Sequence, residues 1–279
     1  MNAIRVAGLT KSYGSFEALR GVSFEIEAGE VFGLLGPNGA GKTTTVEILE
    51  GYRRPDGGEV EVLGEDPQRA GRDWRERIGV VLQSSSLYPN LTVRESLELF
   101  GGYYREPRDV GEVIELVGLG EKASSRVRTL SGGQQRRLDL GLALVGDPEL
   151  IFLDEPTTGF DPSARRTAWE TIRGLRTLGK TVLLTTHYLD EAAQLADRVA
   201  VLREGRIVTL GAPSELVASR EEAEIRYRRN GALVVVTTTE PARTVAELYA
   251  SEGELPALEV RRATLEEIYL SLTEDEANE

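Results

Sequence analysis

A glycine-rich loop early in the chain has the residue types and the spacing that hold a nucleotide phosphate. It fits the pattern G-x-x-x-x-G-K-[ST], and an apolar run precedes it. Glycines let backbone N–H groups converge on an anion, and the start of a helix adds a favourable dipole. We predict that Lys42 contacts the β- and γ-phosphates, that Thr43 holds Mg²⁺ and that Thr44 helps to bind phosphate. This phosphate loop comprises Gly36, Pro37, Asn38, Gly39, Ala40, Gly41, Lys42 and Thr43.

Two carboxylates follow the apolar run Leu150–Leu153, where a strand of a parallel sheet would end. Ligands of such sheets bind at the carboxyl ends of the strands. We predict that Asp154 holds Mg²⁺ through water and that Glu155 orients or deprotonates the attacking water. An acid after an apolar strand is often only a solvated strand end. The prediction therefore depends on the phosphate loop upstream.

A second glycine-rich segment, Leu130–Gln134, lies between these two features and reads L-S-G-G-Q. Its serine and glycines would open a helix, whose free N–H groups can hold a phosphate. The alternative is that Ser131 serves only as an ordinary helix cap. The segment resembles the signature of the ATP-binding-cassette (ABC) ATPases. We call it the signature segment.

Four further residues match motifs of that family in the expected order. Gln83 resembles the Q-loop glutamine, which senses Mg²⁺ and the transport partner. Asp161 resembles the D-loop aspartate, and His187 resembles the switch histidine that contacts the γ-phosphate. Tyr13 resembles the aromatic residue that stacks on adenine. The family commonly has leucine where this chain has Phe160, and the position stays apolar.

The resemblance covers about residues 2–217 and implies a set of site residues. The expected catalytic residues are Lys42, Glu155 and His187, and the expected Mg²⁺ ligands are Thr43, Gln83 and Asp154. The remaining expected nucleotide contacts are Tyr13, the rest of the phosphate loop with Thr44, and Ser131, Gly132, Gly133, Gln134 and Asp161.

The resemblance also implies a fold and a mechanism. The fold would be an α/β P-loop NTPase with a RecA-like core, an N-terminal antiparallel β-subdomain and a helical subdomain at about residues 88–146. The mechanism would be a head-to-tail dimer with two ATP molecules sandwiched between the phosphate loop of one copy and the signature segment of the other. The implied ligands are ATP and Mg²⁺. The implied partners are a second copy and a separate membrane permease, which would dock near Ser84–Pro89.

The apolar pattern predicts the elements that would position these groups. Strands alternate with helices, which indicates a largely parallel sheet. After about residue 219 the pattern changes and predicts a small α+β accessory domain over residues 220–279, following an ATPase domain over residues 1–219. The strands are expected at 2–8, 22–27, 31–35, 59–63, 78–83, 150–153, 182–186, 199–202, 207–210, 224–227 and 232–239. The helices are expected near 42–50, 93–100, 110–117, 133–145, 162–178, 244–251 and 264–272.

Composition narrows the possible partners. The net charge is −13, with 46 acidic and 33 basic residues, which disfavours a nucleic-acid partner because phosphate backbones attract clustered basic residues. The chain has no cysteine, so disulfides and zinc–thiolate sites are excluded. Its apolar runs are shorter than the roughly 20 residues that span a bilayer. We therefore expect a cytoplasmic protein that reaches the inner face of the membrane through its permease.

Several interpretations of the function are compatible with the family. The segment His187–Ala192 and the tail Ala263–Leu270 look most like bacterial multidrug exporters of the daunorubicin-resistance type, which suggests drugs or other small hydrophobic cargo. An importer or a lipoprotein-export ATPase would share the same chemistry with a different cargo. A soluble ABC ATPase without a membrane partner is disfavoured, because the chain lacks zinc or coiled-coil insertions and a tandem cassette. A catalytically silent subunit is disfavoured because the site residues are all present.

Overall fold

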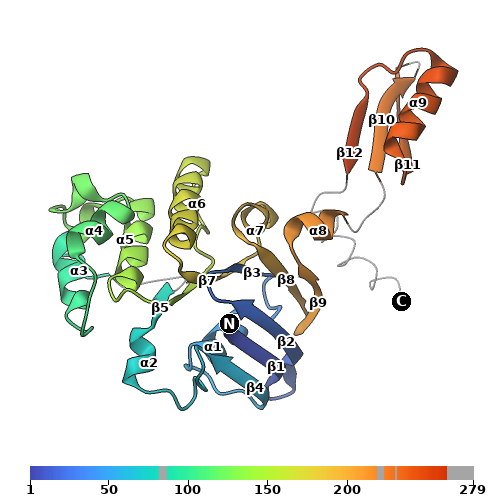
Figure 1. Ribbon diagram of the computed structural model, residues 1–279. Helices are drawn as coiled ribbons and strands as arrows, with labels where there is room; N and C mark the ends of the chain where they lie inside the picture. Colours follow the sequence, from blue (N-terminus) through green and yellow to red (C-terminus); the bar gives the residue numbers. More distant parts are fainter. Residues whose placement is uncertain (82–86, 219–222, 230, 263–279) are drawn as a thin grey trace. The chain divides into compact units, whose positions relative to one another are not determined.

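The computed structural model describes residues 1–81, 87–218, 223–229 and 231–262 (Figure 1). The chain divides into two compact units, Met1–Thr209 and Leu210–Glu279. The domain boundary expected at residue 219 stays a prediction, as do the bounds of the helical subdomain. Several expectations lie outside the described residues: the Q-loop residue Gln83, residues 84–86 of the expected docking segment, the tail 263–270 and the helix over 264–272. Within the described residues, no helix is both long and apolar enough to cross a membrane.

A six-stranded sheet forms the centre of the first unit, with the strand order β5-β6-β7-β3-β8-β9. The paired strands from β5 to β8 run parallel. The central strands are buried along their whole length, as expected for a parallel sheet covered on both faces. The strands are β3 (Val31–Leu35), β5 (Ile78–Val81), β6 (Leu150–Asp154), β7 (Thr181–Thr186), β8 (Arg198–Arg203) and β9 (Arg206–Gly211).

A second, antiparallel sheet has the order β2-β1-β4, with β1 at Asn2–Tyr13, β2 at Phe16–Glu27 and β4 at Gly57–Val62. The first two strands are longer than predicted: the expected strands ended at residue 8 and began again at residue 22, so that prediction was wrong. Register shifts interrupt the β1–β2 pairing, and Gly8 and Gly21 have positive φ there. Such bulges break the two-residue alternation from which strands are recognised.

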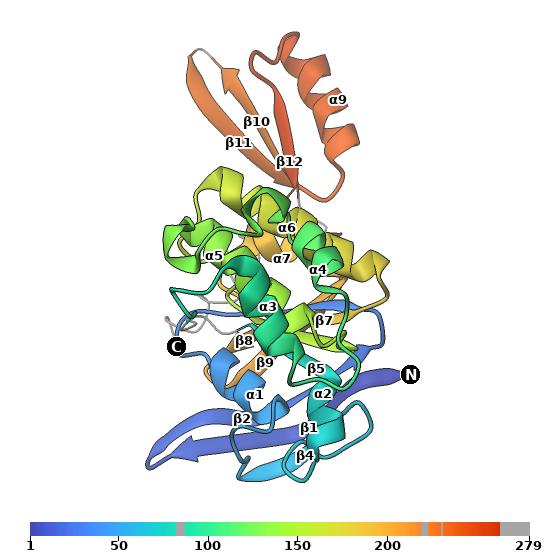
Figure 2. The ribbon, with the colours of Figure 1, turned by 90° about the vertical axis from the view of Figure 1, so that its left-hand side faces the viewer.

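Seven α-helices complete the described part of the first unit (Figures 1 and 2). α3, α4 and α5 pack against one another, whereas α6 and α7 lie over the parallel sheet. The helices are α1 (Lys42–Leu49), α2 (Arg72–Glu76), α3 (Val93–Gly101), α4 (Val110–Leu116), α5 (Gly132–Leu144), α6 (Pro162–Thr177) and α7 (Leu189–Leu195). Two short 3₁₀ helices occupy Gly120–Lys122 and Val127–Thr129.

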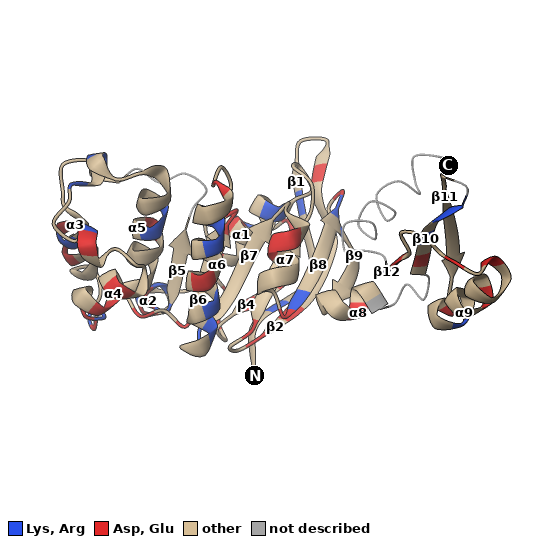
Figure 3. Ribbon diagram, turned by 90° about the horizontal axis from the view of Figure 1, so that it is seen from above, with Lys and Arg blue, Asp and Glu red and all other residues tan. Residues whose placement is uncertain are grey.

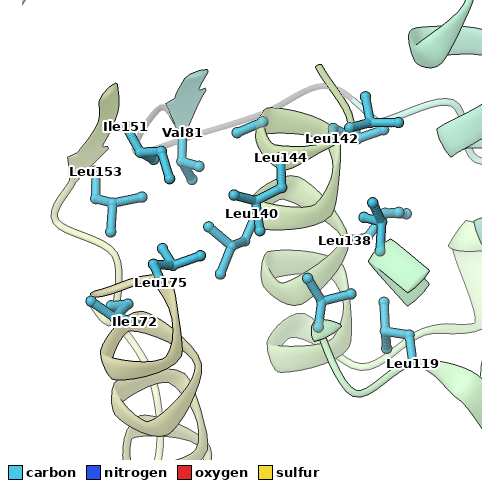
Figure 4. Packing of buried hydrophobic residues seen from close by; sticks show 14 of the residues in the cluster. Val81, Leu119, Leu138, Leu140, Leu142, Leu144, Ile151, Leu153, Ile172 and Leu175 are labelled. Atoms are coloured by element: carbon cyan, nitrogen blue, oxygen red, sulfur yellow. The ribbon is translucent and has the colours of Figure 1, made fainter. Parts of the chain in front are cut away.

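Helix α5 joins the helical cluster to the sheet through one continuous hydrophobic core (Figure 4). Leu140 and Leu144 point from α5 toward Leu175 of α6, and Leu138 points to the opposite side. Gly141 allows α3 and α4 to approach closely, because a Cβ there would lie 3.3 Å from a Leu97 methyl group. The helix that begins at the signature segment is therefore anchored on both sides.

The second unit contains α8 (Pro213–Ala218) and a three-stranded antiparallel sheet in the order β11-β10-β12. The sheet is formed by β10 (Ala223–Arg229), β11 (Ala232–Thr238) and β12 (Glu259–Arg262), and α9 (Pro241–Glu252) accompanies it. Ile225, Tyr227 and Leu255 form its small core. The α+β pattern expected here is present. Strand β12 was not predicted, because a four-residue strand with three charged residues shows little apolar alternation.

Candidate nucleotide-binding site

The phosphate loop connects the end of β3 to the start of α1, and its glycines are required by close packing. A Cβ on Gly36 would lie 2.3 Å from the carbonyl oxygen of Leu202. Gly41 has a φ of +109°, and a Cβ there would lie 2.7 Å from the carbonyl oxygen of Ala18. Gly39 also has positive φ, but the space around it is open. The loop can therefore adopt this path only with glycine at positions 36 and 41.

Lys42 projects from the first residue of α1 back across the loop. Its Nζ donates to the carbonyl oxygens of Gly36, at 2.8 Å, and Pro37, at 3.2 Å. The same atom lies 3.5 Å from Oε1 of Glu155, and the lysine side chain is only 5% exposed. Burial lowers the pKa of Lys42, although the charges of Glu155 and Asp154 oppose that shift. A cation fixed inside the loop is suited to an anionic ligand.

Glu155 follows β6 with a φ of 46°, a conformation that is unusual for a non-glycine residue. Its N–H donates to Thr185, at 3.2 Å to the carbonyl oxygen and 3.0 Å to the hydroxyl. Its side chain accepts a hydrogen bond from the Thr158 hydroxyl, at 3.1 Å, and Oε1 lies 3.2 Å from Nδ1 of His187. Contacts with Thr185, Thr158 and His187 thus keep Glu155 in this strained backbone conformation.

The ionisation state of Glu155 is suitable for a general base. Burial raises its pKa, but His187, Lys42 and Thr158 together outweigh burial, so that the pKa lies below the usual value. The side chain is therefore a carboxylate at neutral pH. A carboxylate can accept a hydrogen bond from a water molecule and take its proton.

The residues expected to hold Mg²⁺ have suitable donor atoms. Oδ1 of Asp154 accepts a hydrogen bond from the Thr185 hydroxyl at 2.5 Å, which fixes the carboxylate at the end of β6. Thr43 is exposed at the start of α1, so that its hydroxyl is accessible. Mg²⁺ takes hard oxygen ligands of these two types together with phosphate oxygens. The donor chemistry therefore fits the ion. The third expected ligand, Gln83, lies outside the described residues.

The phosphate loop opens into a pocket of about 620 Å³, which also contains Glu155 and His187. Tyr13 and Phe16 form one end of it and pair with each other across the β1–β2 turn. The guanidinium of Arg53 lies 5.2 Å from the Tyr13 ring, a cation–π distance that restrains this ring. Phe16, which is 57% exposed, was not predicted as a site residue. Its place on the other side of the turn from Tyr13 could have indicated it.

The signature segment starts α5 and lies beside a second hollow of about 550 Å³. Ser131 and Gln134 form a reciprocal capping box, so the serine caps the helix, as the alternative reading proposed. Ser131, Gly132 and Gly133 nevertheless line the hollow together with Asp161, which caps α6. Gln134 is absent from the lining, since its side-chain oxygen accepts from the Ser131 N–H at 2.9 Å.

The two pockets share Glu155 and Thr158, so both adjoin the same loop after β6. Arg136 of α5 also reaches this loop, donating to the carbonyl oxygens of Asp154, at 3.0 Å, and Pro156, at 3.3 Å. Sequence reasoning missed Arg136, because only the folded chain places α5 beside β6. The helix that begins at the signature segment is therefore bonded to both residues that flank Glu155.

The fold and the site together define a P-loop ATPase: a parallel sheet presents a phosphate loop, a buried lysine and two acids at the carboxyl ends of its strands. Comparison with known proteins is more specific. The family model "ABC transporter" matches residues 19–158. The chain belongs to the ABC transporter family, and it is an ATP-binding ATPase of that family, hydrolysing ATP to ADP and phosphate.

Two curated relatives illustrate the similarity. The Nod factor export ATP-binding protein I of Paraburkholderia xenovorans is 48% identical over 222 residues, which cover 78% of this chain and 73% of the relative. The protein of the same name from Rhizobium sp. (strain N33) is 40% identical over 296 residues, which cover 97% of both chains.

A solved structure agrees with the fold. The ATP-binding cassette MJ0796, in a dimeric post-hydrolysis state bound to ADP and Pi, is 28% identical with a TM-score of 0.67. The match covers 75% of this chain and 98% of that one.

Proposed function

We propose that this chain powers an ABC exporter through ATP-driven closure of a head-to-tail dimer. One observation carries the proposal: the phosphate loop with Lys42 and the start of α5 at Ser131, both of a kind that can hold a phosphate, line two separate pockets. A single ATP bound to the phosphate loop leaves the signature segment without a ligand. A second copy in the opposite orientation supplies one, since each ATP then lies between the two elements. Closure of this kind excludes water and completes the site.

Within each site, the position of each residue indicates its proposed role. Lys42 binds the terminal phosphates, and the Tyr13 ring stacks on adenine. Glu155 orients and deprotonates the attacking water, and His187 contacts the γ-phosphate from beside Glu155. Thr43, Asp154 and Gln83 would hold Mg²⁺, which would supply positive charge against the negative charge on the phosphates. The ion pair between Lys42 and Glu155 exchanges for contacts with nucleotide as ATP enters.

The family and its relatives support a role in export together with a permease. The relatives are named for export, which supports an exporter over an importer. A separate membrane permease docks beside the Q-loop near residues 84–89 and brings the chain to the inner face of the cell membrane. The cargo expected from the sequence, drugs or other small hydrophobic molecules, stays a prediction.

The proposal is tested by purifying the tagged chain from its own cells in mild detergent and identifying what accompanies it. We expect an integral membrane protein of several helices at one copy per chain. It should be absent from a parallel purification of untagged cells. Recovery of ribosomes or DNA-repair proteins instead, or of the chain alone, would contradict the transport role and leave the ATPase activity unaffected.

A further inference from the structure

Helix α7 carries a buried carboxylate that the proposed chemistry does not use. Glu191 is 1% exposed and lies four residues after His187. Its Oε1 accepts hydrogen bonds from the Thr157 hydroxyl, at 2.7 Å, and from the Trp169 indole Nε1–H, at 3.1 Å. Its Oε2 has no hydrogen-bond partner among the residues that the structure describes. Burying a carboxylate is unfavourable unless it is well paired, so an apolar residue would be the simpler filling for this space.

The two donors come from segments that lead to the catalytic residues. Thr157 is two residues beyond Glu155, in the loop between β6 and α6. Trp169 is on α6, and Glu191 is on the helix that follows His187. Figures 1 and 3 show α6 and α7 side by side over the sheet. A single carboxylate oxygen thus bonds the Glu155 loop, α6 and the His187 helix to one another.

Other residues of α6 also contact the segment that contains His187 and α7. The guanidinium of Arg165 lies 4.6 Å from the Tyr188 ring, whose centre is 4.1 Å from the ring of His187. One turn beyond Trp169, Arg173 donates to the side chain of Gln194 at 2.9 Å. That last pair is exposed, so water competes with it. Of the Glu191 contacts, the bond from Thr157 is buried and the bond from Trp169 is part-buried, so water competes less with them than with the exposed pair.

We propose that Glu191 is a positioning residue for ATP hydrolysis, which holds Glu155 and His187 at their mutual distance of 3.2 Å through Thr157 and α7. The proposal rests on the roles given above to Glu155 and His187. Glu191 touches neither nucleotide nor water in this scheme. Its loss leaves the phosphate loop intact, so that ATP binds normally, while the base and the histidine no longer keep the reactive geometry.

The test compares three variants of the full chain by steady-state hydrolysis of ATP, with nucleotide affinity and thermal unfolding measured in parallel. Glu191→Leu removes both acceptor oxygens, whereas Glu191→Gln keeps one oxygen that can accept from Thr157 and Trp169. Gln194→Ala is the control, since it removes an exposed contact between the same two helices. We expect Glu191→Leu to lower kcat about tenfold with KM for ATP within about twofold. The kcat of Glu191→Gln should stay within about threefold of the wild-type value, and the kcat of Gln194→Ala should equal the wild-type value.

Two results would overturn the proposal. One is a wild-type kcat for Glu191→Leu, and the other is an equal loss in Glu191→Gln, which would mean that charge matters and not hydrogen-bond acceptance. If Glu191→Leu does not fold, Thr157→Val combined with Trp169→Phe decides the question, because it removes both donors. An unchanged kcat in that double variant would also overturn it. A wild-type chain that hydrolysed no ATP would instead contradict the proposed roles of Glu155 and His187.

Discussion

At the scale of single residues, the site is a set of charges that compensate one another in a partly buried place. Lys42 and His187 both approach the same oxygen of Glu155, at 3.5 Å and 3.2 Å. The charges of Lys42 and Glu155 would each be unfavourable if buried alone. Lys42 and His187 help to keep the pKa of Glu155 low, and Glu155 in turn opposes the effect of burial on the pKa of Lys42. The site is therefore ready to exchange one partner of Lys42, a carboxylate, for another, a phosphate.

Tyr13 gives a prediction at this scale. Its ring lies in the pocket of the phosphate loop, with Arg53 at 5.2 Å. Because stacking of a base on an aromatic ring contributes about 1–3 kcal/mol, Tyr13→Ala should raise the Kd for ATP about tenfold. Tyr13→Phe should bind ATP like wild type, because it keeps the ring. Titration of each variant with a fluorescent ATP analogue measures the effect, and equal affinity of Tyr13→Ala and wild type would remove Tyr13 from the adenine site.

At the scale of elements, the sheet is aligned by contacts at the start of its strands. Arg77 precedes β5, and Glu149 precedes β6. The Arg77 guanidinium donates to both carboxylate oxygens of Glu149, at 2.6 Å and 3.2 Å, and the N–H of Glu149 donates to the Arg77 carbonyl oxygen at 2.9 Å. The pair therefore fixes the register of β5 beside β6, the strand that delivers Asp154 and Glu155.

This pair predicts a pH-dependent stability. Hydrogen bonds from Arg77 lower the pKa of Glu149 below its usual value of 4.5, against a smaller effect of burial. A lowered pKa stabilises the folded chain above pH 4.5, and that contribution is lost as the pH falls through the folded-state pKa. Since Glu149 is 57% exposed, solvent screening keeps the effect small. Glu149→Gln should lower the free energy of unfolding by about 0.5 kcal/mol at pH 7.

Urea unfolding of the wild-type chain and of Glu149→Gln, at pH 7 and at pH 4, measures the difference between their free energies of unfolding. It should shrink at the lower pH, and it should also shrink at pH 7 in about 1 M NaCl, where charges are screened beyond about 3 Å. A difference that is the same at both pH values would show that Glu149 contributes through packing or a neutral hydrogen bond, and the ionic explanation would then be wrong.

At the scale of the whole molecule, the proposed mechanism depends on where the two candidate phosphate-binding elements lie. The phosphate loop and the signature segment serve different pockets of one chain, and Glu155 lies next to both. Arg136 bonds the signature helix to the residues on either side of Glu155. In the proposed dimer, a movement of α5 as a second copy closes over ATP would therefore reach Glu155 directly.

Trapping the closed state tests this arrangement. Glu155→Gln should bind ATP but lower kcat at least a hundredfold, because the amide cannot take a proton from water. With hydrolysis stalled, dimers should accumulate when ATP and Mg²⁺ are present, and light scattering after size-exclusion chromatography detects them. The same variant without nucleotide, which should be monomeric, is the control. Rapid hydrolysis by Glu155→Gln would remove Glu155 from the proposed role, and a monomer in ATP would contradict the sandwich.

The amino-acid sequence determined the local chemistry of this protein. The phosphate loop, the acid pair after Leu150–Leu153 and the serine–glycine start of α5 are short contiguous patterns, and the structure contains each as a loop or element end. The parallel strands were predictable because each is a short apolar run buried on both faces. The bulged strands β1 and β2 were predicted too short, because a bulge hides the alternation.

Only the tertiary structure decided which distant residues meet. The approach of Nδ1 of His187 to Glu155, the bonds from Arg136 to the carbonyl groups beside Glu155, and the burial of Glu191 under Trp169 all join segments that are far apart in the sequence. None of these contacts has a local pattern, because each depends on strand order and on how α5, α6 and α7 pack. Local chemistry follows from neighbouring residues, whereas contact between remote side chains follows from the packing of the whole core.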